Sequence, residues 1–492
     1  MKCGSCFVEG LLRNRCGWGG TFFLWVLIGL IGSATAWGQD GGSQAARILE
    51  EPFRLKMDEE VPLDKRVVFD WGGWFRSSVW DIRDYVDRDR DGDGDGRRTL
   101  RRQQLRLWGQ LNLDNVHRIY SRGRLDYLDW NQGSSYDGND SDWYGPKLDR
   151  LWYDFNLRRA LLAQGETPGE YDFSLRLGRQ YVEWGMGLAL STPLDAVLVE
   201  GSWRDWSATG LLGMSVAHAY NIDHSFPGNS KESRRYWGVL LNYEGWRDHE
   251  PFAYFFSQDD QDAGSVRNGQ SFGYDSNYTG VGSRGRFFHR DLQYSCEFVV
   301  ETGQNYARGG VDRRQNIMAW AMDTELRYLI PDERESQILI EYLLTSGDPD
   351  RGVSPSNTVG GNRVHTNDSS FVGWGYRNTG LALAPRLSNL GMVRLGYSTF
   401  PAKHIKLFEK LLAGTDFFVY HKQRSDAVIS DDLSTEDSKC VGAEIDFYMN
   451  WRLASDVAWT VRYGVFFPGS AFDQDNSRTD RQHFFTGVTL NF

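Results

Sequence analysis

The residues with the clearest chemical capacity are the aspartates of the stretch 87–96, which reads DRDRDGDGDG. An EF-hand loop binds calcium through alternating oxygen ligands and ends on a bidentate glutamate at position twelve. Counted from Asp87, position twelve is Arg98, and the two later registers place Leu100 and Arg102 there. No register therefore completes an EF-hand. We expect an acidic loop that binds divalent cations loosely at most, through these side chains: Asp87, Asp89, Asp91, Asp93 and Asp95.

Catalytic chemistry has little support in the chain. The nine histidines are scattered, and no H-E-x-x-H metal motif occurs. We therefore expect neither an enzyme nor a bound cofactor.

Composition narrows the class of protein that could position such side chains. Aromatic residues make up 14% of the chain, while the mean hydropathy is -0.52. Such a chain is too polar for helical membrane spans but rich in residues that favour strands and membrane interfaces. The net charge of -11 gives no basic footprint for nucleic acid.

The N-terminus is typical of an exported protein. Positive charges at Lys2, Arg13 and Arg15 precede the apolar run 21–32 and the A-x-A site at 34–36. We interpret residues 1–36 as a signal peptide, with a signal anchor as the alternative, and residues 37–62 as a periplasmic lead-in. Cleavage would leave two cysteines, which form no disulfide framework. These features favour the envelope of a Gram-negative-type bacterium.

From residue 63 to residue 492 one pattern repeats, in which apolar and polar side chains alternate over segments of about ten residues. In 441–451, for example, Val441, Ile445 and Phe447 share one face, and Glu444 lies on the other. Tilted membrane strands need about nine to eleven residues, more than the five or six of soluble strands. The pattern predicts an all-β fold, a single antiparallel transmembrane β-barrel of about 18 strands.

The connections between these segments alternate between short and long. Short turns belong to the periplasm and long loops to the outside, so we expect both termini in the periplasm. The longest loop, 347–388, lies outside in this scheme, and the sequence leaves open whether it folds inward as a plug.

Several stretches resemble the alginate-export family of outer-membrane channels. They are FSLRLGRQYVEWGMGLAL (173–190), TPLDAV (192–197), VRYGVFFPGSAFD (461–473) and TGVTLNF (486–492). The resemblance implies an 18-stranded barrel that passes a polyuronate out of the cell. The last residue, Phe492, is similar to the C-terminal signal that such barrels present to the insertion machinery.

Strand parity predicts which side chains line the lumen, because apolar faces point to lipid. The predicted basic residues suit carboxylates through fixed guanidinium forks. They are Arg76, Arg106, Arg122, Arg124, Arg158, Arg176, Arg286, Arg327, Arg394, Arg452 and Arg462. The predicted acidic residues are Asp70, Asp126, Asp154, Glu244, Glu297, Glu301, Asp323, Glu325, Glu341, Glu444 and Asp446. The lumen is thus mixed, and the arginines either guide an anionic polymer or pair with carboxylates across strands.

Arg179 breaks the pattern, because strict alternation places it on the lipid face with Leu175 and Leu177. A charge at the membrane midplane costs about 2–4 kcal/mol. Either a bulge at Gly178 turns Arg179 into the pore, or Arg179 lies at a membrane interface. The resemblance to the alginate-export family favours the inward position.

Three functions fit these features. The first is a channel that exports an anionic polysaccharide, and the second is a general or solute-specific uptake porin. The third is a surface barrel for adhesion or structure whose long loops carry the function. Expected partners are outer-membrane lipid and lipopolysaccharide, a polysaccharide or small polar solute, and the barrel insertion machinery.

Overall fold

A computed structural model describes residues 67–84, 96–131, 140–216, 233–261, 266–267, 270–271, 273–287, 291–306, 314–351, 366–431, 433–472 and 479–492. The expected signal peptide, the lead-in and the aspartates of the acidic loop lie outside these residues.

The described residues form one closed sheet of 18 antiparallel strands, as the sequence predicts. The wall consists of β1 (Val67–Arg83), β2 (Arg97–Leu113), β3 (His117–Trp130), β4 (Ser141–Asn156), β5 (Tyr171–Glu183), β6 (Ser191–Trp203), β7 (Trp206–Ser215), β8 (Arg234–Tyr243), β9 (His249–Asp260), β12 (Tyr274–Phe287), β13 (Leu292–Tyr306), β14 (Arg314–Leu329), β15 (Gln337–Thr345), β16 (Leu390–Thr399), β17 (Leu411–Lys422), β18 (Cys440–Arg452), β19 (Val457–Pro468) and β20 (Arg481–Asn491). A separate small hairpin pairs β10 (Val266–Arg267) with β11 (Gln270–Ser271).

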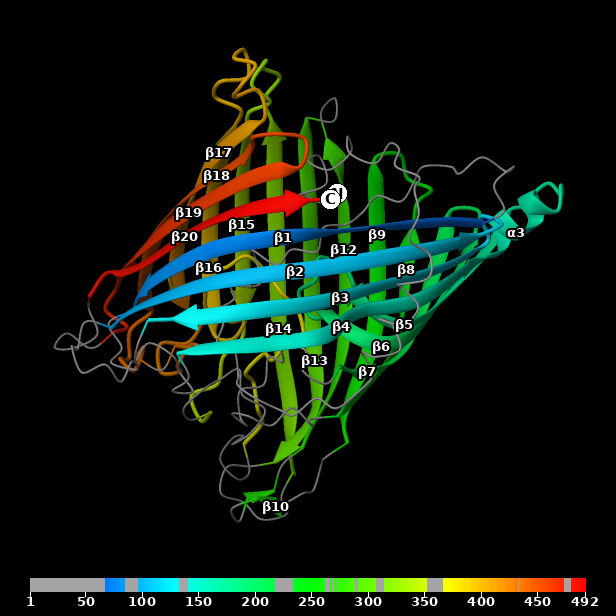
Figure 1. The fold of residues 1–492 in the computed structure, drawn as a ribbon. Helices are drawn as coiled ribbons and strands as arrows, with labels where there is room; N and C mark the ends of the chain where they lie inside the picture. The colour runs from blue at the N-terminus through cyan, green and yellow to red at the C-terminus, as the bar shows by residue number, and fades with distance from the viewer. Residues whose placement is uncertain are drawn as a thin grey trace.

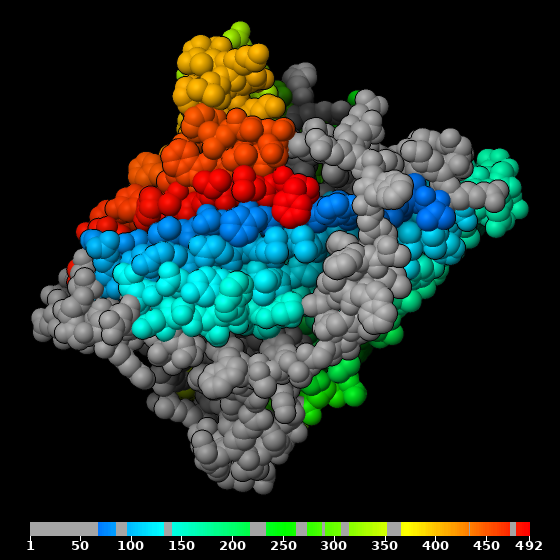
Figure 2. All heavy atoms as spheres, viewed as in Figure 1, coloured from blue at the N-terminus to red at the C-terminus, as the bar shows by residue number. Residues whose placement is uncertain are grey.

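The first and last strands close the barrel. β1 pairs with β20 from Trp74 opposite Asn491 to Arg83 opposite Gln482. The red C-terminal strand therefore lies beside the blue N-terminal strand on the surface (Figure 2). Closure satisfies the backbone groups of every edge, which hydrocarbon requires.

Burial alternates along the strands and separates two faces. In β2 the even-numbered residues from Arg98 to Asn112 are buried inside the barrel, while Arg101 and Leu107 on the other face are exposed. Large apolar side chains dominate the outer face around the barrel, among them Val239, Phe298 and Phe447. This band is the surface that lipid covers.

One connection differs from the expectation. The all-β pattern predicts no helix, but β4 ends at Asn156 and the helix α3 (Leu157–Ala163) follows it. The Asn156 side chain caps this helix by accepting a hydrogen bond from the backbone N–H of Arg159 (2.9 Å). The helix sequence LRRALLA lacks period-2 alternation and favours a helix. No helix in the described ranges is long and apolar enough to cross a membrane.

The long connection between β15 and β16 enters the barrel. We call residues 366–389 the inward segment. Phe371, Val372 and Trp374 in this segment are buried. Its backbone also pairs with the start of β14, where Met318 N donates to Asp368 O (2.8 Å). The described part of the loop whose direction the sequence left open, from residue 366 onward, therefore folds into the lumen.

Candidate functional site

The lumen has two chemically different sides. The basic wall comprises lumen-facing cations of β2, β3 and β4, namely Arg102, Arg106, Arg122, Arg124, Lys147 and Arg150. The acidic wall comprises lumen-facing carboxylates of β13 to β18, namely Glu297, Glu301, Asp323, Glu325, Glu341, Asp416, Glu444 and Asp446.

Like charges face one another directly on the basic wall. The strand register places Arg106 opposite Arg124 and Arg124 opposite Lys147, so three cations form a row across three strands. A second pair places Arg122 opposite Arg150. Like charges directly opposite each other destabilise a sheet. A negative charge placed beside the row would lower this repulsion.

Two carboxylates lie among these cations, and each lies within ion-pair distance of two arginines. Asp149 accepts from Arg122 (2.5 Å) and lies 3.7 Å from Arg106. Asp126 accepts from Arg102 (2.8 Å) and lies 3.5 Å from Arg124. The basic wall thus keeps an excess of positive charge. The Arg106 and Arg122 guanidinium groups also both lie 5.5 Å from the ring centre of Trp74.

Asp149 was not predicted from the sequence. It shares the lumen with Arg150 because the register between β3 and β4 shifts beside Arg122. A bulge of this kind adds one residue to a strand and breaks simple alternation. No motif in the sequence marks its position.

The acidic wall holds the inward segment through backbone N–H groups. The Glu444 carboxylate accepts from the backbone N–H groups of Leu381 (2.6 Å), Ala382 (2.7 Å) and Leu383 (2.9 Å). Glu301 accepts from Val372 N (2.9 Å) and from the Tyr274 hydroxyl (2.6 Å). These carboxylates are therefore part of the attachment of the inward segment.

Arg377, on the inward segment, lies at the centre of an ion-pair network. Its guanidinium is 2.5 Å from Asp323, 2.9 Å from Glu341 and 3.5 Å from Glu325. Burial opposes the charge of this group, but Asp323, Glu341 and Glu325 together raise the pKa of Arg377 above its ordinary value. Arg377 thus stays charged and offsets part of the negative charge of Asp323, Glu325 and Glu341.

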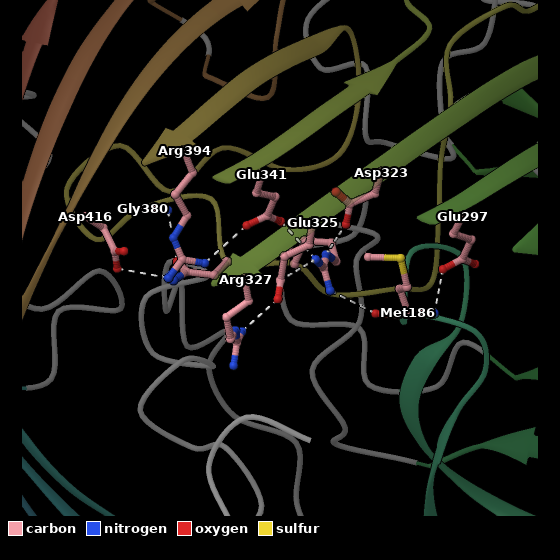
Figure 3. Close-up of polar contacts among 11 residues, drawn as sticks. Met186, Glu297, Asp323, Glu325, Arg327, Glu341, Gly380, Arg394 and Asp416 are labelled. Atoms are coloured by element: carbon pink, nitrogen blue, oxygen red, sulfur yellow. Dashed lines mark hydrogen bonds and ion pairs between the residues drawn. The ribbon is translucent and has the colours of Figure 1, made fainter. Parts of the chain in front are cut away.

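The network continues along the wall on either side. Figure 3 shows Arg394 between Asp416 (2.9 Å) and Glu341 (3.2 Å), and Arg327 beside Glu325 (2.7 Å). These two predicted pore arginines each contact carboxylates on the same wall.

A second connection, 184–190, also lies in the lumen and pairs with the inward segment. Trp374 N donates to Ala189 O (2.8 Å), and Tyr376 N donates to Gly187 O (2.8 Å). Met186 N donates to Glu297 (2.6 Å), and Figure 3 shows these two residues together. Gly185 has a positive φ of 59°, and a Cβ there would lie 2.7 Å from the Glu297 carboxylate. Residues 184–190 (WGMGLAL) and the inward segment thus lie side by side inside the barrel. We call these two connections together the partition.

The remaining predicted pore residues fall in different places. Arg176 pairs with Asp154 (3.1 Å) and lies over the Trp152 ring inside the barrel. Arg462 lies opposite Tyr448, and Asp446 shares the lumen face with Glu444. Arg452 lies at the end of β18, where it donates to Ser455 O in the turn (2.9 Å).

Two predicted positions are wrong. Arg158 is an exposed residue of α3, because the strand ends before it. Arg179 stays on the outer face, because the register continues unbroken through Gly178 and places it opposite Leu151 and Asp195. Arg179 instead pairs with Asp195 (2.8 Å) and donates to Leu148 O (3.0 Å). The ion pair, rather than a bulge, neutralises the charge.

The described ranges give no support to a metal site or to a nucleophile elbow. Within the described ranges, no three His, Cys, Asp or Glu side chains are grouped to hold a metal ion. Residues 269–273 (GQSFG) match the spacing of a nucleophile elbow, which requires a strand-to-helix turn. Gln270 and Ser271 instead form β11 of the small hairpin.

Comparison with known proteins agrees with this architecture. The family model described as "Alginate export" matches residues 87–486. Among solved structures, OccK5 (OpdH) of Pseudomonas aeruginosa aligns with a TM-score of 0.52 and 11% identity, covering 86% of this chain and 98% of that chain. OccAB1 of Acinetobacter baumannii aligns with a TM-score of 0.51 and 10% identity, covering 86% and 96%. At these identities the likeness concerns the fold alone. No curated protein matches the sequence.

Proposed function

The chain belongs to the alginate export family and is an outer-membrane β-barrel channel, and from this premise we propose that it passes an anionic polysaccharide along the basic wall. The observation that carries the proposal is the row of Arg106, Arg124 and Lys147 across three strands. A polymer with a carboxylate on each sugar would relieve the repulsion within this row and would gain charge-assisted hydrogen bonds.

We infer the route along the basic wall because the inward segment occupies the acidic wall. Glu301, Glu444 and Asp323 hold the inward segment. All three are fully buried, so they offer no exposed acidic surface to a polyanion. The inward segment contacts the connection 184–190 and the strands β8 (through Tyr236), β12 to β18, and β20 (through His483). We infer that the polymer passes on the other side of this partition, against β2, β3 and β4.

The alternative function is uptake of a small polar solute. The two inward connections occupy part of the lumen. Positive and negative side chains both line it, which would suit a small molecule that carries a positive and a negative group. A polymer and a small solute differ in how they block the channel. A bound polymer contacts several cations at once, so its affinity rises with its length.

Planar-bilayer recordings test the proposal. We expect the parent channel to prefer anions, and we expect polyuronate oligomers to reduce its current more strongly as their length increases. In the double variant Arg106→Gln/Arg124→Gln, the anion preference should fall about fivefold per charge, since a unit charge at about 4 Å contributes ~1 kcal/mol in water-like surroundings.

The matched control is Arg101→Gln, because Arg101 lies on the outer face of the same strand and pairs with Asp129 (3.6 Å). This variant should keep the selectivity of the parent. A cation-selective parent channel, or one that polyuronates do not block at any length, would overturn the proposal. Block by monomeric solutes without length dependence would favour the uptake porin.

A further inference from the structure

The connection between β16 and β17 has an unusual composition for its place in the barrel. Residues 400–410 read FPAKHIKLFEK, with three lysines and one glutamate, whereas the whole chain carries a net charge of -11. The turn lies at the end of the barrel assigned to the periplasm, and it stands out as a prominence above β17 (Figure 1 and Figure 2). A basic turn on an acidic protein indicates a negatively charged partner.

The tip of this turn exposes large apolar side chains. Ile405 is 43% exposed and Leu407 is 61% exposed. The backbone holds them in place through successive turns, in which Ile405 N donates to Ala402 O (2.9 Å) and Phe408 N donates to Ile405 O (2.8 Å). Two adjacent apolar side chains on an ordered projection suit contact with an apolar medium better than contact with water.

The turn packs against the outer face of the barrel at Trp451. The Phe408 ring stacks on Trp451 with 4.9 Å between centroids, and Trp451 Nε1 donates to Leu407 O (3.2 Å). Trp451 shares its face of β18 with Phe447, which is 49% exposed in the lipid-facing band. The apolar tip therefore continues the lipid-facing surface and lies on the opposite side of the wall from the lumen.

The lysines flank this tip. Lys403 is held by Glu335 (2.5 Å) of the neighbouring turn, while Lys406 and Lys410 are exposed next to Leu407. Lysine can bury its aliphatic stem in an apolar layer while its ammonium group reaches phosphate. Apolar residues beside exposed lysines match the boundary between acyl chains and anionic head groups.

We propose that the 400–410 turn binds the periplasmic leaflet of the outer membrane. Ile405 and Leu407 enter the head-group boundary, and Lys406 and Lys410 bind the phosphates of anionic phospholipids. The site anchors the barrel rim between β16 and β17 to lipid. It is independent of whatever passes through the lumen.

Lipid quenching tests the position of the tip. The processed barrel, without residues 1–36 and with Cys296→Ser and Cys440→Ser, is placed in nanodiscs, and a fluorophore is attached through Leu407→Cys. We expect acyl-chain nitroxide lipids to quench this label nearly as strongly as one at Leu395→Cys on the lipid-facing face of β16. A label at Ala454→Cys, in the exposed turn after β18, is the aqueous control. Quenching of the Leu407 label by iodide alone, as in that control, would overturn the proposal.

Charge substitution tests the lipid class. The probe is a bilayer of zwitterionic lipid with or without phosphatidylglycerol. In the parent, phosphatidylglycerol should increase lipid quenching at Leu407, and Lys406→Gln/Lys410→Gln should abolish this increase, since each lysine near the surface contributes about fivefold in affinity for anionic lipid. Lys439→Gln, at the opposite end of the barrel, should change nothing. An increase that persists in the double variant would contradict the role of the lysines.

Discussion

Arg377 shows how one residue can determine the shape of the channel. It comes from the inward segment, and its guanidinium contacts three carboxylates of the acidic wall. Removal of one partner from a buried ion-pair network leaves uncompensated charge and costs several kcal/mol. The same group also donates to Met186 O (3.1 Å) in the second inward connection. Arg377 thus joins both inward connections to the wall.

We expect Arg377→Ala to loosen the inward segment without unfolding the barrel. Repulsion among Asp323, Glu325 and Glu341 should weaken the attachment by about 3 kcal/mol, and the single-channel conductance should rise and fluctuate more. Arg424→Ala is the control, because Arg424 pairs with Asp426 at an exposed position. Equal conductance of the parent and Arg377→Ala would show that the segment is held without this residue.

Among the elements, the inward segment has the largest effect on the lumen. It has little regular structure, and its place depends on the Glu444 and Glu301 carboxylates that accept its backbone N–H groups. The strands behind it are complete without it, because each pairs with both neighbours in the sheet. The strand pairing of the barrel therefore does not depend on the inward segment.

Replacement of residues 371–384 by a short Gly–Ser linker should leave a folded barrel with two altered properties. Conductance should rise because the partition is lost. Anion preference should fall because Glu301, Glu444 and Asp323 lose their partners and face the pore. Bilayer recordings measure both, and heat-dependent migration on a gel checks folding. A rise in conductance with unchanged selectivity would contradict the view that the segment neutralises the acidic wall.

At the scale of the whole molecule, closure depends on the two ends of the chain. Phe492 N donates to Gly73 O (3.0 Å), and Gly73 N donates to Phe492 O (2.8 Å), which extends the pairing of β1 with β20. The Phe492 side chain is exposed on the outer face with Val488 and Leu490. An exposed side chain at this position is what the expected role of Phe492 as a signal to the insertion machinery requires.

Deletion of Phe492 should reduce assembly in the cell more than folding in the test tube. The variant loses one pair of backbone hydrogen bonds, a net of about 1–2 kcal/mol, which a barrel of this size tolerates. Its level in the outer membrane should fall severalfold, while refolding into lipid vesicles should proceed nearly as in the parent. Phe484→Leu, on the outer face of the same strand, is the control. Equal losses in both assays would assign Phe492 a structural role alone.

The sequence by itself determined the strands, the faces and the closure of this barrel. Alternation is a local property of the pleated backbone, so the outward position of Phe447 and the inward position of Glu444 follow from neighbouring residues. Closure follows because hydrocarbon does not tolerate open edges. The arginines of β2 and β3 were assigned to the lumen for the same reason. α3 was missed because it follows β4 directly and, at seven residues, is too short for periodicity alone to separate it from the end of a strand.

Only the tertiary structure decided what the lumenal charges contact. Glu444 bonds to Leu381, 63 residues away in sequence order, and Arg377 lies in a segment with no periodicity to interpret. The shift that brings Asp149 beside Arg122 and the unbroken register at Gly178 that keeps Arg179 outside are properties of paired strands. A side chain's face is set by its own strand, but its partner is set by how distant segments meet. The division of the pore into a basic and an acidic wall therefore emerges only in the folded barrel.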